Sequence, residues 1–364
     1  MHHYAAMDAL SLRPHLESLY PRHRVVAIEP LSPDRAATDD STAKVAGFGQ
    51  PVHVSLIGPD GAPLELVWRT ASADELGHDR RSDRAAEALL AFDDFAKIPG
   101  HVAPLDVGVV RHTGELVSIR DYEELYLLTP FARGVPYAND LRTIARNGHA
   151  EEHDHERVRG LAMYLARLHT PLGDAQRYRR SIRDLVGSGE GIFGVIDSYP
   201  GSVAGAPESR LEGIERRAAR WRWRLREHEG RLSRIHGDFH PFNILFDGDK
   251  LVLLDASRGT AGDPADDLSA LAINFLLFAL DSEDGWKGLG PLWFRLWQTY
   301  AEHHHDPSLG YVVPPFLAWR ALVVCNPKFY PNLSGPARSS LLSLVECMLD
   351  ADHFDPAWAS ELFR

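Results

Sequence analysis

Two acidic residues and an asparagine near the middle of the chain have the types and spacing that phosphoryl transfer requires. Residues 236–243 read His-Gly-Asp-Phe-His-Pro-Phe-Asn, and Asp255 follows at the end of the apolar run 250–255. In transfer from ATP, one carboxylate orients the acceptor hydroxyl and accepts its proton, while an amide and a second acid bind Mg²⁺ beside the phosphates. We therefore predict Asp238 as the catalytic base, and Asn243 and Asp255 as oxygen ligands of Mg²⁺. The pattern indicates a kinase of some kind.

Composition narrows the classes of protein to consider. The 364 residues suffice for two domains with hydrophobic cores, and the formal net charge of −12 argues against a nucleic-acid-binding protein. No apolar run reaches the ~18 residues of a membrane helix, and the first residues lack a secretion signal. Cys325 and Cys347 have apolar neighbours and no Cys-x-x-Cys pattern, so we expect two buried thiols. We expect a cytoplasmic protein without nucleic-acid or membrane partners; no feature selects an oligomeric state.

The first third of the chain carries the signals of β-strands. Residues 52–57 and 64–69 are apolar or alternating runs separated by Gly-Pro-Asp-Gly, which predicts a β-hairpin. Residues 83–95 begin with an aspartate suited to an N-cap and have a helical apolar face. A short helix is expected at 7–19, a polar loop at 32–42, and further strands at 105–110, 116–119 and 125–128. Together these elements predict one antiparallel sheet with a helix packed on it.

Beyond Pro130 the pattern becomes helical. A linker rich in Gly, Pro and Ser spans 187–207, and two short strands at 243–246 and 251–254 are joined by Asp-Gly-Asp, another hairpin signal. Helices are expected at 151–169, 209–229, 266–280, 288–304, 314–325 and 336–350. A small β-rich lobe, a hinge at 129–133 and a larger helical lobe with the catalytic hairpin predict a bilobal kinase arrangement.

These motifs resemble those of the aminoglycoside phosphotransferase and choline kinase-like family, which has the protein-kinase-like fold. Residues 236–245 are similar to its His-Gly-Asp-x-x-x-x-Asn-Ile-Leu element, Asp255 to its metal-binding acid, and residues 262–268 to its Gly-Asp-Pro-x-x-Asp-Leu element. The resemblance implies a bilobal α+β fold. Residues 1–131 would form the ATP-binding lobe, a small antiparallel sheet plus helix with a short N-terminal extension. Residues 132–364 would form the mainly helical lobe with the catalytic loop and the acceptor site.

The resemblance also implies a phosphate-covering loop in the first lobe. Gly47 and Gly49 precede a strand, as in a shortened version of that loop. Glycine there would let backbone N–H groups approach phosphate oxygens closely. A simple turn is the alternative interpretation, and the polar loop at 32–42 is a rival for the same role.

The strand at 64–69 should present a cation to the phosphates of ATP but contains no lysine. Arg69 is the expected residue, because some of the family has arginine here and a guanidinium suits phosphate geometry. Glu87, on the next helix, would be its ion-pair partner, as the strand lysine and helix glutamate pair in kinases. Lys44 is the alternative cation.

Other residues are expected to support the site. Thr129 and Phe131 flank Pro130 in the hinge, whose backbone would bind the adenine edge; proline itself has no N–H to donate. We expect His236 to form a hydrogen bond with the backbone of the catalytic loop. Asp267 is expected to cap the following helix or to brace that loop.

The sequence thus predicts an ATP- and Mg²⁺-dependent phosphotransferase that moves the γ-phosphoryl group to a hydroxyl of a small molecule. Aminoglycosides, amino alcohols, sugars and related metabolites are all open as acceptors, and the stretch 326–332 would either line the acceptor pocket or serve as a connecting loop. A protein kinase is disfavoured, because Ala256 and Ser257 stand where protein kinases have Phe-Gly. A nucleotide-binding pseudokinase is motivated by Arg69 and opposed by the intact Asp238.

Overall fold

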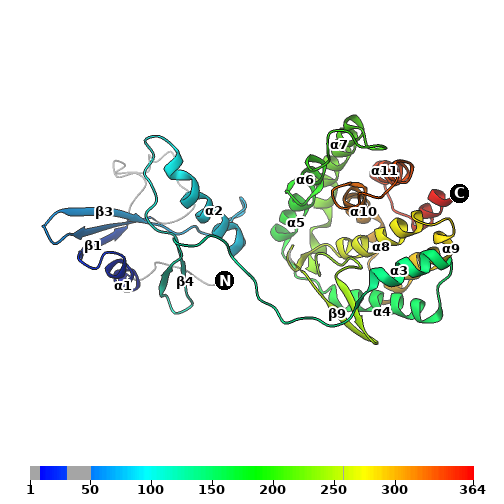
Figure 1. Ribbon diagram of the computed structural model, residues 1–364, viewed down its shortest axis with the longest axis horizontal. Helices are drawn as coiled ribbons and strands as arrows, with labels where there is room; N and C mark the ends of the chain where they lie inside the picture. The colour runs from blue at the N-terminus through cyan, green and yellow to red at the C-terminus, as the bar shows by residue number, and fades with distance from the viewer. Residues whose placement is uncertain (1–8, 31–50, 257) are drawn as a thin grey trace. The chain divides into compact units, whose positions relative to one another are not determined.

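The computed structural model describes residues 9–30, 51–256 and 258–364 (Figure 1). The chain divides into two compact units, unit 1 (Met1–Thr129) and unit 2 (Pro130–Arg364). The division drawn from the sequence falls between residues 131 and 132. Each unit has its own cluster of buried hydrophobic side chains.

Unit 1 is built on a three-stranded antiparallel sheet in the order β1–β2–β3. Its strands are β1 (Arg24–Pro30), β2 (Val52–Ile57) and β3 (Pro63–Trp68). The predicted β2–β3 hairpin is confirmed, and Gly61 in its turn has a φ of 79°, a conformation that favours glycine. Strand β1 was not predicted. Helix α1 (Ala9–Leu19) supplies Leu12 and Leu16 to the small core of this sheet.

The rest of unit 1 differs from the single sheet that the sequence predicted. Helix α2 (Arg81–Asp94) is followed by the 3₁₀ turn η1 (Phe95–Lys97), and β4 (Gly108–Val110) pairs with β5 (Leu116–Ser118) in a separate two-stranded sheet. The prediction of a strand at 125–128 was wrong, because this segment has no regular secondary structure. A strand needs a neighbour for its backbone N–H and C=O groups. Within the described residues, β4 and β5 pair only with each other.

Unit 2 is mainly helical, as predicted. Its helices are α3 (Tyr137–Asn147), α4 (Glu152–Leu168), α5 (Ala175–Gly187), α6 (Ile192–Asp197), α7 (Glu208–Arg224), α8 (Pro264–Leu280), α9 (Gly285–His303), α10 (Leu309–Cys325) and α11 (Gly335–Asp350), with 3₁₀ segments η2 (Leu225–Arg231) and η3 (Pro356–Phe363). The linker expected at 187–207 was partly wrong, because it contains α6. That helix forms despite the surrounding glycines because Ile192 and Val195 are buried in the core. Helices α3 and α5 were not predicted individually.

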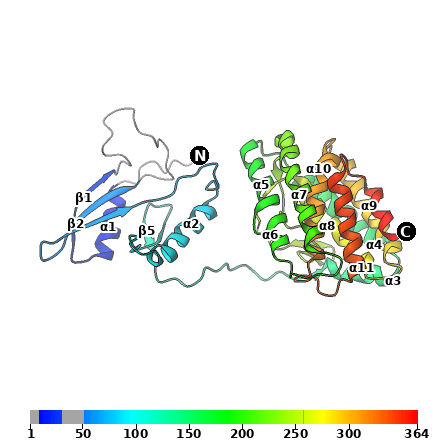
Figure 2. The same cartoon turned by 90° about the horizontal axis from the view of Figure 1, so that it is seen from above.

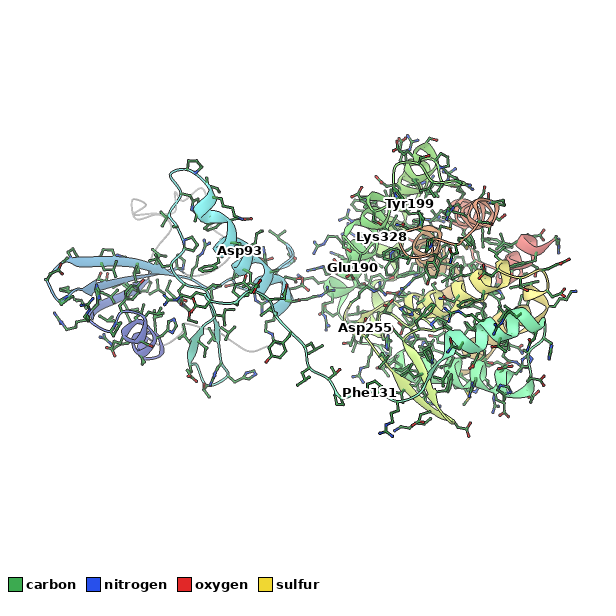
Figure 3. All side chains as sticks on the ribbon, viewed as in Figure 1. Asp93, Phe131, Glu190, Tyr199, Asp255 and Lys328 are labelled. Atoms are coloured by element: carbon green, nitrogen blue, oxygen red, sulfur yellow. The ribbon has the colours of Figure 1, made fainter. Side chains whose placement is uncertain are left out.

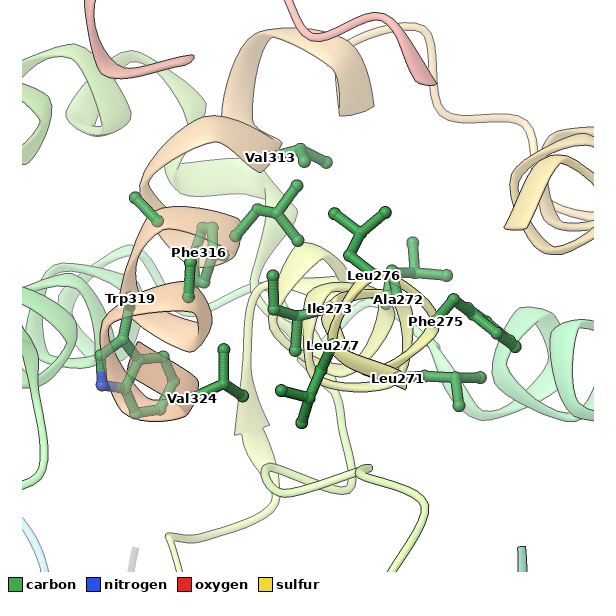
Figure 4. Close-up of a cluster of buried hydrophobic side chains, with 14 of the residues drawn as sticks. Leu271, Ala272, Ile273, Phe275, Leu276, Leu277, Val313, Phe316, Trp319 and Val324 are labelled. Carbon is green, nitrogen blue, oxygen red and sulfur yellow. The ribbon is translucent and has the colours of Figure 1, made fainter. Parts of the chain in front are cut away.

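Helix α8 lies at the centre of unit 2. It is apolar on nearly all sides and packs against α3, α9 and α10 (Figure 2), as expected for a helix buried within a large core. Figure 4 shows side chains of α8, including Ile273 and Leu277, in one cluster with Phe316 and Val324 of α10. The first turn of this helix carries Asp266 and Asp267, which contact the loop at residues 236–243 or its neighbours.

Two small sheets in unit 2 frame that loop. Strands β6 (Val135–Pro136), β8 (Ile244–Asp247) and β9 (Lys250–Leu253) form one sheet, and β7 (Ser233–Arg234) pairs with β10 (Ala261–Gly262). The predicted β8–β9 hairpin is confirmed. Because β7 ends just before residue 236 and β8 begins just after residue 243, the loop between them has both ends held by strands.

The α+β fold class predicted from the sequence is confirmed: one unit has small antiparallel sheets and a few helices, and the other is largely helical. The prediction of two buried thiols is half right. Cys325 is buried, whereas Cys347 is exposed on α11. No helix in the described parts of the chain has both the length and the apolar character needed to cross a membrane.

Candidate active site

The β8–β9 hairpin brings Asn243 and Asp255 to the same end of the sheet. Ile244 pairs with Leu253, and one step further the backbone N–H of Leu254 donates to the carbonyl oxygen of Asn243 at 2.9 Å. Asp255 follows directly. The backbones of two residues that are twelve positions apart in the sequence therefore come close together at the open end of the hairpin.

Asp255 has an unusual backbone conformation. Its φ is 48°, and it is the only non-glycine residue with positive φ in the described part of the chain. This left-handed conformation is uncommon for residues with a Cβ atom and is concentrated at functional sites, where the surrounding structure maintains it. The side chain is exposed at an edge of unit 2 (Figure 3). The hairpin thus ends in a strained turn that presents a carboxylate to solvent.

The carboxylate of Asp238 has two unlike sides. Its Oδ1 atom accepts a hydrogen bond from Nη1 of Arg320 at 2.7 Å and lies 3.5 Å from Nη2 of Arg258. Its Oδ2 atom lies 3.4 Å from both Nε2 of His240 and Nδ2 of Asn243. Oδ1 is therefore held firmly by arginine, while Oδ2 has only long contacts and can accept a further hydrogen bond.

Electrostatics keep Asp238 ionised. Burial alone would raise the pKa of this carboxyl. The hydrogen bond from His240 and the charges of Arg320 and Arg258 outweigh burial and hold its pKa well below the usual range. A carboxylate with such a low pKa is a weak base, so Asp238 is better suited to aligning a hydroxyl than to removing its proton early.

Arg320 joins two acids beneath the loop. Its side chain, 7% exposed, extends from α10 and donates to Asp238 through Nη1 and to Oδ1 of Asp266 through Nη2 at 2.8 Å. Sequence reasoning missed both Arg320 and Asp266. A usable signal existed: Arg320 is the only charged residue of α10, which is otherwise almost entirely apolar. A lone charge in such a helix needs a buried partner.

Arg258 completes this cluster and was also missed. Its Nη2 atom lies 3.5 Å from Oδ1 of both Asp238 and Asp266. The guanidinium groups of Arg258 and Arg320 lie over the ring of Trp319, at 4.1 Å and 4.2 Å from its centroid. Trp319 is itself fixed, because its Nε1 donates to the backbone oxygen of Glu190 at 2.8 Å.

Asp267 braces the loop at residues 236–243, which is one of the two roles predicted for it. Its two carboxylate oxygens accept the backbone N–H groups of His236 at 2.7 Å and Gly237 at 2.8 Å, and Nε2 of His169 lies 3.2 Å away. Gly237 has a φ of 85°, and a Cβ there would lie 2.5 Å from the carbonyl oxygen of Gly259. The predicted backbone hydrogen bond of His236 is also confirmed, because its Nδ1 accepts the N–H of Asp238 at 3.2 Å.

Asp263 anchors the start of α8. Its side chain accepts the N–H of Ala265 as an N-cap, the hydroxyl of Tyr178, and two hydrogen bonds from Arg231 at 2.8 and 2.9 Å. Burial raises the pKa of Asp263, but Arg231 outweighs this effect and lowers it. The helix that carries Asp266 and Asp267 therefore begins at a fixed position.

The residues predicted to bind the nucleotide lie in or near unit 1. The guanidinium of Arg69 lies over the ring of Phe95, 5.6 Å from its centroid, and Oε2 of Glu87 lies 3.7 Å from Nε2 of His78. The structure thus gives Arg69 and Glu87 other neighbours instead of bringing them together. Thr129 and Phe131 are exposed, on either side of the division between the units. Gly47, Gly49, Lys44 and the loop at 32–42 lie outside the described residues.

Asn243 and Asp255 offer donors of the kind that Mg²⁺ prefers. The amide nitrogen of Asn243 donates to the carbonyl oxygen of Asp238 at 3.1 Å, so its amide oxygen is the group left for a cation. Asp255 adds an exposed carboxylate. Among the described residues, no three His, Cys, Asp or Glu side chains are grouped to hold a metal ion. Mg²⁺ does not need such a group, because it is commonly held by one or two carboxylates together with water and substrate phosphates.

Comparison with known proteins agrees with this geometry. The family described as "Phosphotransferase enzyme family" matches residues 78–302, more than half of the chain, including Asp238, Asn243 and Asp255. A search of curated proteins finds no match.

Several solved structures are similar to the chain. A glucosamine kinase shares 13% identity, covering 90% of this chain and 93% of its own, with a TM-score of 0.40. An amicoumacin kinase in complex with AMP-PNP, Ca²⁺ and Ami shares 13% identity, covering 96% and 97%, with a TM-score of 0.41. A choline/ethanolamine kinase family protein from Mesorhizobium loti shares 16% identity, covering 91% and 94%, with a TM-score of 0.33.

Proposed function

This chain belongs to the phosphotransferase enzyme family, and on that basis we propose that it transfers the γ-phosphoryl group of ATP to a hydroxyl of a small molecule in an Mg²⁺-dependent reaction. One observation carries the proposal: Asp238 contacts Asn243, which lies beside Asp255 at the open end of the β8–β9 hairpin. An aligning carboxylate and two oxygen donors at one position are the parts that phosphoryl transfer requires. We expect the protein to act in the cytoplasm, because ATP is available there.

Asp238 would align the acceptor. Its Oδ1 is held by Arg320, so the carboxylate cannot rotate freely, and its Oδ2 is the oxygen with capacity for the acceptor hydroxyl. Alignment of this kind lowers the activation barrier of transfer substantially, because the acceptor loses its orientational freedom when it binds and not at the moment of reaction. The proton would pass to Oδ2 late, when the oxygen–phosphorus bond is largely formed and the hydroxyl has become more acidic.

Asn243 and Asp255 would hold Mg²⁺, which neutralises charge on the phosphates when bound. Between them the chain contributes one amide oxygen and one carboxylate. Asp267 fixes the backbone at the start of the loop that carries Asp238 and Asn243. For the nucleotide itself, the candidates remain Gly47, Gly49, Arg69, Glu87, Thr129 and Phe131.

A coupled assay of ADP release tests this function. Purified protein is incubated with Mg-ATP and a panel of aminoglycosides, amino alcohols, sugars, sugar acids and hydroxy acids, with Asp238→Asn as the blank. We expect acceptor-dependent ADP release by the wild type that the variant lacks. A parallel melting curve with and without Mg-ATP reports nucleotide binding, since a ligand at 100 times its Kd adds about 2.7 kcal/mol of stability. Binding of Mg-ATP without ADP release from any acceptor would favour a pseudokinase instead.

A further inference from the structure

Arg258 has hydrogen-bonding capacity that the protein does not use. Only its Nη2 atom approaches an acid, and the 3.5 Å distances to Asp238 and Asp266 are at the outer limit of a hydrogen bond. Among the described residues, Nε and Nη1 of Arg258 have no hydrogen-bond partner, and neither is a fully buried atom. The side chain is 17% exposed. A guanidinium with free donors therefore lies beside the carboxylate proposed to align the acceptor.

The two nearby acids do not account for the presence of Arg258. Arg320 already binds Asp238 at 2.7 Å and Asp266 at 2.8 Å, with good geometry for a charged pair. Burial and the like charge of Arg320 lower the pKa of Arg258, in spite of Asp266 and Asp238. Arg258 is therefore not needed to pair either acid, and its contacts to them are long.

The same part of unit 2 carries further positive charge. Tyr330, in the stretch 326–332, lies within electrostatic reach of Arg142, Arg320 and Asp238, and Lys328 is exposed two residues before it. Besides Asp266 and Asp238, the exposed Glu190 is a third acid that acts on Arg258. Figure 3 labels Glu190, Lys328 and Asp255 along one edge of unit 2.

We propose that Arg258, supported by the ring of Trp319, binds an anionic group of the acceptor, a carboxylate or a phosphate, while the acceptor hydroxyl lies at Oδ2 of Asp238. This inference rests on the proposed function and names the class of acceptor. A guanidinium stacked on an aromatic ring keeps a fixed orientation and suits carboxylate and phosphate oxygens. A cationic acceptor would instead bring an ammonium group close to Arg258 and Arg320, and like charges at such distances repel.

Matched pairs of acceptors test the charge preference. Glycerate is compared with glyceramide, and glucuronate with glucuronamide and 6-amino-6-deoxyglucose, because each set keeps the same hydroxyl groups and changes only the group that carries the charge. ADP release is measured in each case. So is the melting temperature with Mg-AMP-PNP, because this second readout needs no transfer. We expect the anionic member of a set to give the higher kcat/KM and the larger rise in melting temperature.

Variants at position 258 test the residue. Arg258→Gln should raise the KM for the anionic acceptor about tenfold or more, because a charge-assisted hydrogen bond is lost. The loss should be clearly larger for the anionic acceptor than for the matched amide, the KM for ATP should stay within about twofold, and Arg258→Lys should recover part of the loss. Arg226→Gln is the matched control, because Arg226 also lies over a tryptophan ring, that of Trp223, at 4.8 Å. We expect it to behave as wild type.

Three results would overturn the inference. One is a preference of the wild type for the amide or amino member of the sets. Another is an anion preference that Arg258→Gln leaves unchanged. The third is the absence of any effect of the anionic members on either readout. Failure of the proposed function has a different signature: Arg258-dependent stabilisation by the anionic compounds would persist without ADP release from any of them.

Discussion

Two pairs of aspartates close together in unit 2 use their carboxylates in opposite ways. Asp263 and Asp267, at the start of α8, are 1% and 0% exposed and have both oxygens engaged by the protein. Asp238 and Asp255 keep access to solvent, and Oδ2 of Asp238 has only long contacts. The difference shows how one short stretch combines rigidity with chemistry: satisfied buried acids fix the backbone, and neighbouring acids that reach solvent stay accessible to a substrate or a cation.

The pairs should also differ in what their loss affects. A buried carboxylate with several hydrogen bonds contributes to the free energy of unfolding, because its removal leaves donors unsatisfied inside the protein. An acid that reaches solvent at the proposed site should contribute less to stability and more to turnover. If the comparison holds, mutations in the two pairs should separate in a plot of activity against stability.

The largest effect is expected from Asp238→Asn, which removes the aligning charge but keeps the shape of the side chain. Turnover on the true acceptor should fall by roughly 10² to 10⁴, as for other positioned acid–base groups. The free energy of unfolding should also fall, because the ion pair with Arg320 is lost, but by less than for Asp267→Ala, because the asparagine keeps a hydrogen-bond acceptor and Arg320 retains Asp266. Initial rates of ADP release and thermal unfolding measure the two quantities. A variant with more than half of the wild-type turnover would remove Asp238 from the functional pair.

Asp267→Ala should show the reverse order of effects. The substitution leaves the N–H groups of His236 and Gly237 and the ring of His169 without their shared acceptor. We expect the free energy of unfolding to fall by about 3–5 kcal/mol, in the range found when one partner of a buried polar network is removed. Urea denaturation followed by far-UV circular dichroism measures this loss, with Ser202→Ala, at an exposed loop position, as a reference near zero. A loss below about 1 kcal/mol would contradict a bracing role.

The sequence was sufficient to predict that Asp238 and Asn243 lie together and that Asp267 either caps the following helix or braces the loop, the second of which the structure shows. Spacing singled out Asp238, Asn243 and Asp255, and the Asp-Gly-Asp turn correctly predicted the hairpin that places the last two side by side. These features are local, because a two-strand register follows from the turn and the apolar pattern.

What the sequence could not supply depends on contacts between distant segments. Arg320 lies far along the chain from Asp238, and only the packing of α10 on α8 brings them together. The failure at 125–128 has the same origin: an apolar run predicts a strand only if a partner is available, and no local signal reports the partner. Likewise, Arg69 and Glu87 were expected as a pair from the order of elements, and that order does not determine side-chain contacts.

The ionisation of Asp263 gives a smaller effect, visible in acid. Arg231 lowers the pKa of the folded-state carboxyl, whereas the unfolded chain has a pKa of about 3.9. The ionised form therefore stabilises the fold at pH values above about 4, and this contribution is lost as the pH falls through the folded-state pKa. The free energy of unfolding, measured between about pH 2.5 and 6, should fall less steeply with acidification for Asp263→Asn than for wild type. The two slopes should differ by at most the effect of one bound proton, about 1.4 kcal/mol per pH unit. Asp350→Asn is the control, because its pairs with Arg217 and Arg220 are exposed and screened. Parallel curves for wild type and Asp263→Asn would show that the Arg231 pair does not distinguish the folded from the unfolded state.

The smallest effect concerns the backbone of Asp255. Its φ of 48° suits glycine better than any residue with a Cβ atom. Asp255→Gly should therefore be more stable than Asp255→Ala by about 1 kcal/mol, the cost of a left-handed conformation for an ordinary residue. Both variants lose the carboxylate and should lose Mg²⁺-dependent turnover to the same extent. The two variants should therefore differ in stability and not in activity. Denaturant unfolding of the two proteins gives the difference directly. Equal stabilities would mean that the strain is absent in solution, and the turn would then present Asp255 without any conformational cost. A more stable glycine variant that is inactive would show that the fold retains strain at this position because the carboxylate is needed there, in contrast to the satisfied acids at the start of α8.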